Sequence, residues 1–403
     1  AQQSKPPYIN ASSGLAGFVH GYQIYQSTAI LGSGGSEPAI SAVLAETQRA
    51  QQFGFTQGEL ERAKLNFLKA YEQQFNEREK TQSGVFTQAY VNHFLSQTPI
   101  SGAENELAYV KQLLPSISLA QLNQLAAELI PSKAKTLIAL VAPEKNDYVL
   151  PDASQLSAQV DKAHLQTVKA YSEKVLSSQL IEKMPTSGKI IRQSQQAKIG
   201  LTTIEFANGI KVLLKPTDFK NDQVLLSGYR DGGTSNYSEL DSLNATFAGS
   251  LSGITGLGAF TPTDLRKTLA GKIAGASTSV SDTQDVVSGQ SNAQDIEAML
   301  QLLYLQFTQV RQDADLFDAF AGKVKPLLSQ AGNDPNQAFN DFYLKQLFQN
   351  HPRASSLPSK AQIDAMSFKR SYQINRERFG NANGFTFVMV GSFDVEKIKP
   401  LLA

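Results

Sequence analysis

The chain contains 403 residues, of which 41% are hydrophobic and 18% are charged, and its formal net charge is +1. This length exceeds what one ordinary hydrophobic core requires, so two or three domains are expected, and the composition excludes an intrinsically disordered chain. The sequence has no cysteine, no apolar run of membrane-spanning length and no clustered basic charge, which argues against thiolate chemistry, a membrane span and a nucleic-acid partner.

The first half predicts a strand followed by a series of helices. In the second helix, apolar residues recur three or four positions apart, and Thr56 with Glu59 forms a capping-box pattern at its start. The predicted elements are a strand at 18–32, helices at 36–54, 56–75, 82–95, 104–113 and 118–129, and a strand at 134–144. Helical spacing predicts a buried interface between the first two helices, formed by Ile40, Val43, Leu44, Leu60, Phe67, Leu68 and Tyr71.

The second half predicts a similar mixture of strands and helices. A hairpin-like strand pair leads through a Gly-rich strand end, RDGGTS, into a helix of mostly small residues. The predicted elements are strands at 202–216, 222–233, 273–281, 285–292 and 384–393, and helices at 237–253, 261–272, 294–308, 313–330, 335–348, 360–366 and 368–379.

The order of elements and short matches suggest that the two halves are copies of one α+β unit. A Leu-Pro-Ser sequence occurs at Leu114 and again at Leu357, and helix starts at Glu37 and Gln294 have a similar offset. The expected fold is therefore α+β with duplicated domains, each an antiparallel-rich sheet with helices packed on one face. Residues 151–200 are polar and rich in Ser, Gln and Lys, which favours a strap between the halves over a helix lying on the surface.

Local motifs for catalysis or cofactor binding are missing from the sequence. The four histidines, His20, His93, His164 and His351, stand far apart, so no zinc-binding pair forms within a helical turn. The glycine-rich stretch 32–38 lacks the Lys-Ser/Thr of a phosphate loop, and 252–260 follows a helix, the reverse of the dinucleotide-binding order. The serines at 249–253 do not have the spacing of a nucleophile elbow.

Three segments resemble the pitrilysin/insulinase family of zinc peptidases. Phe206-Ala207-Asn208-Gly209-Ile210-Lys211-Val212 is similar to the strand that opens a domain in that family, and Val388-Met389-Val390-Gly391-Ser392-Phe393-Asp394 is similar to a strand-helix unit of a neighbouring domain. Residues 53–74 resemble the helix that begins Gly-(Val/Phe)-Thr-x-x-Glu-Leu. Together these matches extend over most of the chain outside 151–200.

The resemblance implies that this chain lacks the metal ligands of active family members. Active members carry His-x-x-Glu-His on the helix after the Gly-Ser strand end, where two imidazoles and a downstream Glu hold zinc. The corresponding positions here include Thr246, Gly249 and Ser250, which are neither imidazole nor carboxylate. The chain is therefore expected to have no catalytic, cofactor-binding or metal-binding residues of its own, and Zn²⁺ is expected in a missing first domain.

The resemblance also implies a place for each segment in a longer protein. Residues 1–150 resemble a second domain without its opening strand and helix, and 201–380 resemble a third domain. Residues 151–200 are the linker, and 384–403 resemble the start of a truncated fourth domain. The implied partners are the missing N-terminal catalytic domain and, for the parent peptidase, peptide substrates.

Two functions remain open from the sequence. One is the non-catalytic portion of a zinc metallopeptidase, and the other is a catalytically inactive homologue that serves as a binding or scaffold subunit. The lack of cysteine and the usual location of members of the family that the chain resembles favour a periplasmic or otherwise extracytoplasmic compartment.

Overall fold

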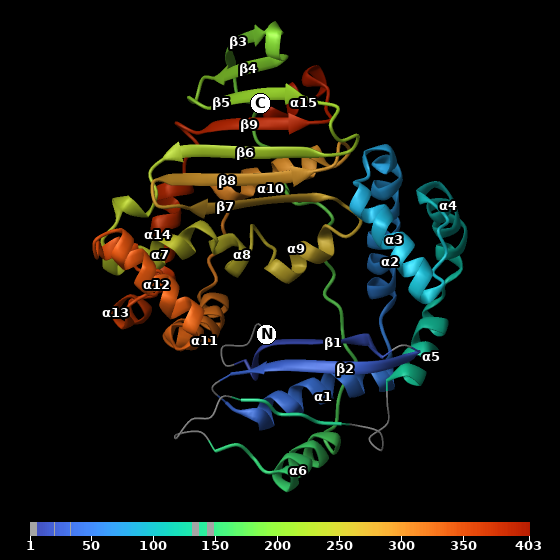
Figure 1. Cartoon of the computed structure of the whole chain (residues 1–403). Coiled ribbons are helices and arrows are strands. Elements are labelled where there is room, and N and C mark those ends of the chain that lie inside the picture. The colour runs from blue at the N-terminus through green and yellow to red at the C-terminus, as the bar shows by residue number, and fades with distance from the viewer. Residues whose placement is uncertain (1–5, 20, 33, 131–136, 143–148) are drawn as a thin grey trace. The chain divides into compact units, whose positions relative to one another are not determined.

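The computed structural model describes residues 6–19, 21–32, 34–130, 137–142 and 149–403. The chain forms two compact units, one made of residues 1–61 and 115–175 and the other of residues 62–114 and 176–403. Each unit combines strands with helices, so the mixed α and β character expected from the sequence is confirmed (Figure 1).

The first unit contains a two-stranded antiparallel hairpin and helices that pack beside it. Helix α1 contacts both strands as well as α5 and α6. Two strands replace the single strand predicted at 18–32, and Gly21, with a φ of 83°, lies in the turn between them. The elements are β1 (Tyr8–Val19), β2 (Tyr22–Leu31), α1 (Ser36–Phe53), α5 (Leu119–Leu129), α6 (Ala153–His164) and the start of α2 (Gln57–Asn76).

The second unit is organised around a seven-stranded sheet of order β3-β4-β5-β9-β6-β8-β7 (Figure 1). Only the β5–β9 pair is parallel, so the sheet is antiparallel-rich as predicted. The strands are β3 (Ile190–Gln196), β4 (Leu201–Phe206), β5 (Lys211–Pro216), β6 (Val224–Asp231), β7 (Ala274–Val280), β8 (Gln284–Ser291) and β9 (Thr386–Gly391).

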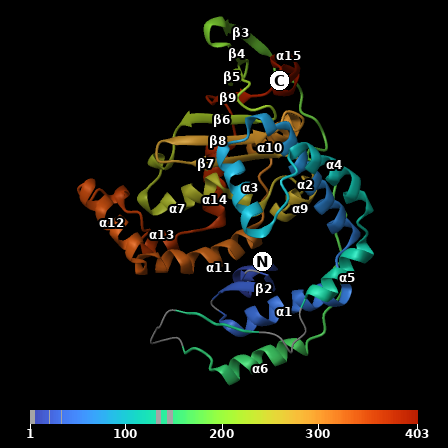
Figure 2. The same ribbon diagram turned by 45° about the vertical axis from the view of Figure 1, so that its right-hand side comes forward.

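Helices cover one face of this sheet. Helix α10 runs alongside β7 and β8, and α7 packs on β7 (Figure 2). The remainder of α2 also belongs to this unit. The other helices are α3 (Ser83–Ser96), α4 (Ala103–Leu113), α7 (Ser242–Gly249), α8 (Leu251–Thr255), α9 (Pro262–Thr268), α10 (Ile296–Thr308), α11 (Ala314–Gln330), α12 (Pro335–Leu347), α13 (Lys360–Asp364), α14 (Phe368–Phe379) and α15 (Val395–Leu402).

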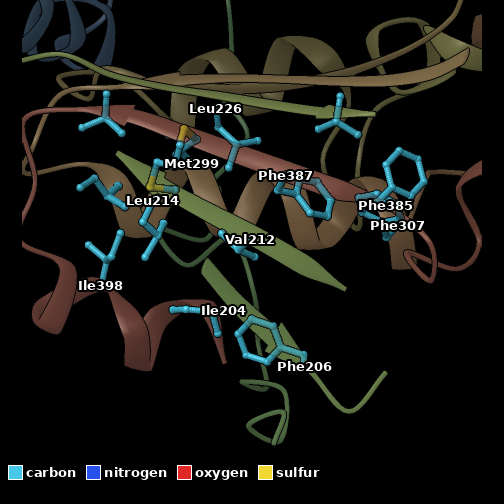
Figure 3. Close-up of a cluster of buried hydrophobic side chains, with 14 of the residues drawn as sticks. Ile204, Phe206, Val212, Leu214, Leu226, Met299, Phe307, Phe385, Phe387 and Ile398 are labelled. Atoms are coloured by element: carbon cyan, nitrogen blue, oxygen red, sulfur yellow. The ribbon is translucent and has the colours of Figure 1, made fainter. Parts of the chain in front are cut away.

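The main core lies between the sheet and helices α10, α14 and α15. Alternate residues of each central strand are buried, as a sheet covered on one face requires. Figure 3 shows Val212, Leu226 and Phe387 from three strands in this cluster. Phe307 of α10 packs edge-on against Phe385, with ring centroids 5.4 Å apart, and so joins the helix layer to the strand layer.

The prediction of a buried interface between the first two helices is wrong. Of the seven residues expected there, only Leu60 is buried, and Phe67 is 48% exposed. Helical periodicity identifies an apolar stripe, but it does not identify what covers the stripe.

The boundaries of the compact units also differ from the expected domain boundaries. Residues 384–403, expected to start another domain, supply β9 and α15 to the second unit, because β9 pairs with both β5 and β6. The strap 151–200 contains helix α6 and strand β3. Residues 137–142 are not a strand, and the rest of the strand expected at 134–144 lies outside the described residues.

A buried ion-pair network fixes the end of β6 to the end of α14. The carboxylate of Asp285, on β8, is fully buried. It accepts hydrogen bonds from Arg230 Nη2 at 2.9 Å and from Arg378 Nη2 at 2.6 Å. The hydrogen bond to Asp285 raises the pKa of Arg378.

We expect Asp285→Asn to lower the free energy of unfolding by about 3–5 kcal/mol, because it leaves two guanidinium groups without their buried counterion. Urea denaturation followed by circular dichroism measures the change. The control is Asp364→Asn, which breaks the Lys360–Asp364 pair, whose side chains are 88% and 61% exposed. The control should cost about 0–1 kcal/mol. Equal losses in both variants would contradict the role of the network.

A second carboxylate, Asp341 of α12, accepts hydrogen bonds from the backbone of the segment that follows this helix. Asp341 Oδ1 accepts from the Ser356 and Leu357 backbone N–H groups at 2.8 and 3.2 Å. Burial alone raises the pKa of Asp341, but hydrogen bonds from Lys345, Ser355 and Leu357 outweigh it and lower this pKa to about 2.

This lowered pKa predicts a pH dependence of stability. A carboxyl whose pKa is lower in the folded state stabilises the fold above its unfolded pKa, and this contribution disappears as the pH falls through the folded value. The stability difference between the native protein and Asp341→Asn should therefore be constant near neutral pH and shrink between about pH 4 and pH 2. Urea titrations across this range test it, and a difference that persists unchanged at pH 2 would refute it.

Candidate functional site

Helix α7 and its C-cap residue Ser250 contain the positions at which the resemblance places a metal motif in active relatives. The single helix predicted at 237–253 is divided at Ser250 into α7 and α8. Thr246 and Ser250 are exposed and Gly249 is buried. The Thr246 hydroxyl donates to the Ser242 carbonyl oxygen at 3.0 Å, within its own helix. These three residues do not fit zinc, because hydroxyl and glycine side chains supply neither imidazole nor carboxylate.

Gly249 lies where the helix touches the backbone of β7. A Cβ atom added at Gly249 would sit 2.7 Å from Ser279 Cα and would also collide with the backbone nitrogen of Val280. The Thr278 hydroxyl donates to the Gly249 carbonyl oxygen at 2.6 Å, which fixes the contact from the strand side. The small residue therefore permits a close helix-sheet approach, which is a structural role.

The opposite side of α7 is attached to α14 by two buried asparagines. Asn375 Nδ2 donates to the Ala248 carbonyl oxygen at 2.8 Å. Asn244 Oδ1 accepts from the Ser367 backbone N–H at 2.9 Å, at the start of α14. Helix α7 is thus held between a strand and a helix by backbone contacts.

The histidines that the structure describes do not converge. His93 Nδ1 lies 2.9 Å from the Thr98 carbonyl oxygen, His164 Nδ1 lies 3.4 Å from Gln48 Nε2, and His351 Nδ1 accepts from the Arg353 backbone N–H. His20 lies outside the described residues. Within the described ranges, no three or more His, Asp or Glu side chains are placed to hold a metal ion.

The face of the seven-stranded sheet opposite the helices is a second candidate site, which the sequence analysis missed. Its side chains are mostly small or aliphatic, and they line a hollow of about 790 Å³. Leu225, on β6, is 45% exposed there. We call this surface the open face. The residues that line the hollow from this side include Leu225, Ser227, Gly275, Ser277, Ser288, Gln290, Val388 and Val390.

Strand register arranges the open face in rows that cross the sheet. The middle row is uncharged and consists of Ser194, Thr203, Leu213, Val388, Ser227, Ser288 and Ser277. A neighbouring row consists of Arg192, Glu205, Lys211, Thr386, Tyr229, Val286 and Ser279. Alternation in each strand could have indicated an accessible face, but the rows depend on strand order.

The second unit is an α+β fold with an antiparallel-rich sheet and helices on one face. The comparisons identify its relatives. No family model matches the chain. A zinc protease PQQL-like protein of Arabidopsis thaliana is 24% identical over 375 residues, which are 88% of this chain and 34% of that protein.

Two solved structures have the same fold. The periplasmic protease PqqL from Escherichia coli aligns with a TM-score of 0.51 and 17% identity, over 98% of this chain and 43% of that chain. A point mutant of the ferredoxin protease FusC, solved in complex with Arabidopsis ferredoxin, aligns with a TM-score of 0.61 and 15% identity, over 99% of this chain and 44% of that chain. The resemblance to zinc peptidases of the pitrilysin/insulinase family is therefore confirmed. The chain spans about a third of its curated relative.

The close contact at Gly249 generates a prediction. Gly249→Ala should lower the free energy of unfolding by about 1–3 kcal/mol, because the new methyl group meets backbone atoms of β7 that cannot rotate away. The control is Gly253→Ala in α8, where an added Cβ meets nothing within 4 Å. The control should stabilise the protein by up to about 1 kcal/mol through helix propensity. Thermal or urea denaturation of both variants tests the prediction, and a Gly249→Ala variant as stable as the native protein would refute it.

Proposed function

We propose that the chain is the non-catalytic portion of a zinc metallopeptidase that hydrolyses peptides in a closed chamber. Its similarity to a zinc protease over 88% of its length, but only 34% of that protein, is the observation that carries the proposal. In this proposal Zn²⁺ and the catalytic residues belong to an N-terminal domain outside residues 1–403. Residues 1–150 and 201–380 correspond to the second and third domains, and 151–200 to the linker.

In this proposal, the open face is the surface through which the chain contacts peptides. It is a broad accessible surface of small hydroxyl and aliphatic side chains, and the hydroxyl groups can donate hydrogen bonds to, and accept them from, the backbone of an extended polypeptide. The proposed role of the chain is to hold a peptide while the missing domain cleaves it. Helix α7 supports the fold from the other face and takes no part in the chemistry.

The alternative is a catalytically inactive homologue that acts as a binding or scaffold subunit. Both functions use the same inert helix, so the discriminating observation lies upstream of residue 1 in the gene. A His-x-x-Glu-His motif there supports the peptidase, and a first domain without it supports the scaffold.

We also place the parent protein outside the bacterial cytoplasm. The support is the absence of cysteine and the description of one structural neighbour as periplasmic. Among the described residues, no helix is both long and apolar enough to cross a membrane.

The proposal predicts that purified 1–403 contains no stoichiometric zinc and cleaves no unfolded peptide, because Thr246, Gly249 and Ser250 supply no zinc ligand and no base. Elemental analysis and a fluorogenic peptide assay measure both properties. Addition of the upstream domain should give cleavage that a chelator inhibits. One tightly bound zinc per chain, or chelator-sensitive cleavage by 1–403 alone, would overturn the proposal.

A further inference from the structure

We propose that the open face selects peptides that carry a carboxylate a few residues from an apolar segment. The apolar segment occupies the hollow over β6–β9 and β7–β8, and the carboxylate lies beside the cations of β3 and β5. This inference rests on the proposed function, because it names the class of peptide that the same surface takes.

The charges of the open face are concentrated at one side of the sheet. Arg192 on β3 and Lys211 on β5 flank Glu205 on β4, since Glu205 is the cross-strand neighbour of both. Lys215 lies four residues beyond Lys211 on the same face of β5 and donates to the Ile199 carbonyl oxygen. Lys198 belongs to the same turn as Ile199.

Two cations, Arg192 and Lys211, therefore flank one carboxylate, and Lys198 and Lys215 lie toward the other end of β4 and β5. Arg192, Lys198 and Lys211 have no ion pair or side-chain hydrogen bond among the described residues. Unpaired surface cations with one intervening carboxylate leave a positive local potential, which attracts acidic ligands.

The other side of the open face has a different chemistry. The hollow over β9, β6, β8 and β7 is lined by Leu, Val, Ser, Gly and Gln side chains and by no charged residue. Asp231, at the end of β6, is exposed and is paired in register with Gln284. This carboxylate disfavours an acidic residue beside that end of β6, whereas Arg192 and Lys211 favour one at β3–β5.

Strand spacing sets the spacing of the two features in a ligand. Lys211 pairs in register with Thr386 on β9, and Thr386 pairs with Tyr229 on β6. Adjacent strands lie about 4.8 Å apart, so the Lys211 backbone is about 10 Å from strand β6, on which Leu225 and Ser227 line the hollow. An extended peptide rises about 3.3 Å per residue. A peptide that crosses the strands therefore meets the cations about three residues after its apolar anchor.

The test uses the whole chain and three short fluorescein-labelled peptides measured by fluorescence anisotropy. All three begin with the same Leu-Ser repeat, and they end in two Glu, two Gln or two Lys residues. We expect the Glu peptide to bind about three- to tenfold more tightly than the Gln peptide at low salt, since each exposed ion pair is worth up to about fivefold. About 0.5 M salt should remove most of this preference.

Variants locate the effect. Arg192→Ser combined with Lys211→Ser should reduce the Glu preference to near unity and leave binding of the Gln peptide unchanged. Lys369→Ser, which removes an exposed cation of α14, is the matched control and should keep the preference. Ser288→Trp fills the hollow with an uncharged side chain and should weaken binding of all three peptides at least tenfold. Circular dichroism of each variant checks that the fold is intact.

The outcomes distinguish failure of the charge selection from failure of the proposed peptide-holding function. If the three peptides bind equally and Ser288→Trp abolishes this binding, the charge selection is overturned and the open face is still a peptide-binding surface. A Glu preference that survives loss of Arg192 and Lys211 would also overturn it. Binding of none of the peptides, or binding that Ser288→Trp does not change, would overturn both the selection and the proposed role of the open face.

Discussion

Strand β9 is the element on which the sheet of the second unit depends. It lies between β5 and β6, and without it the order β3-β4-β5-β9-β6-β8-β7 divides into two three-stranded pieces. Its residues Phe387 and Met389 are buried in the main core, 5% and 0% exposed. Because β9 is far in sequence from β5 and β6, the sheet is complete only after long-range pairing, and this pairing carries a loop-closure cost.

The one-sided sheet and the inert helix are parts of the same arrangement. Helix α7 approaches the backbone of β7 closely because Ala245, Ala248 and Gly249 have little or no side chain. An imidazole or carboxylate here would occupy the space that the strand now fills. The packing of this helix therefore leaves no room for a larger side chain at Gly249.

Much of the fold could be read from the sequence, because strong local signals coincide with the real elements. The predicted helices 36–54, 313–330 and 368–379 match α1, α11 and α14 to within one or two residues at each end. The single strand predicted at 202–216 is wrong, because the Asn208-Gly209 turn, with a φ of 82° at Gly209, divides it into β4 and β5. Strand β9 separates β5 from β6, so the predicted pairing of 202–216 with 222–233 does not form.

What the sequence did not reveal depends on contacts between distant residues. Strand β3 has the sequence IIRQSQQ, without apolar alternation, and is a strand because its backbone pairs with β4. Helix α6 is held on α1 by polar contacts such as Ser36 to Gln159, at 2.9 Å, which no hydrophobic pattern announces. The metal position at Thr246, Gly249 and Ser250 remains an interpretation from the resemblance. The open face could not be predicted from the sequence, since its rows require the position of β9.

The two edges of the sheet differ in their openness to a further strand. At β7, the Gln306 side chain donates to the Ala276 carbonyl oxygen at 2.9 Å, and Gly249 lies against the backbone of Val280. Backbone groups that could template another chain are therefore occupied by the protein itself. Strand β3 has six exposed residues of seven and, among the described residues, pairs with a strand on one side only. Unintended association through β-sheet extension is consequently restricted to one direction, away from the β7 edge.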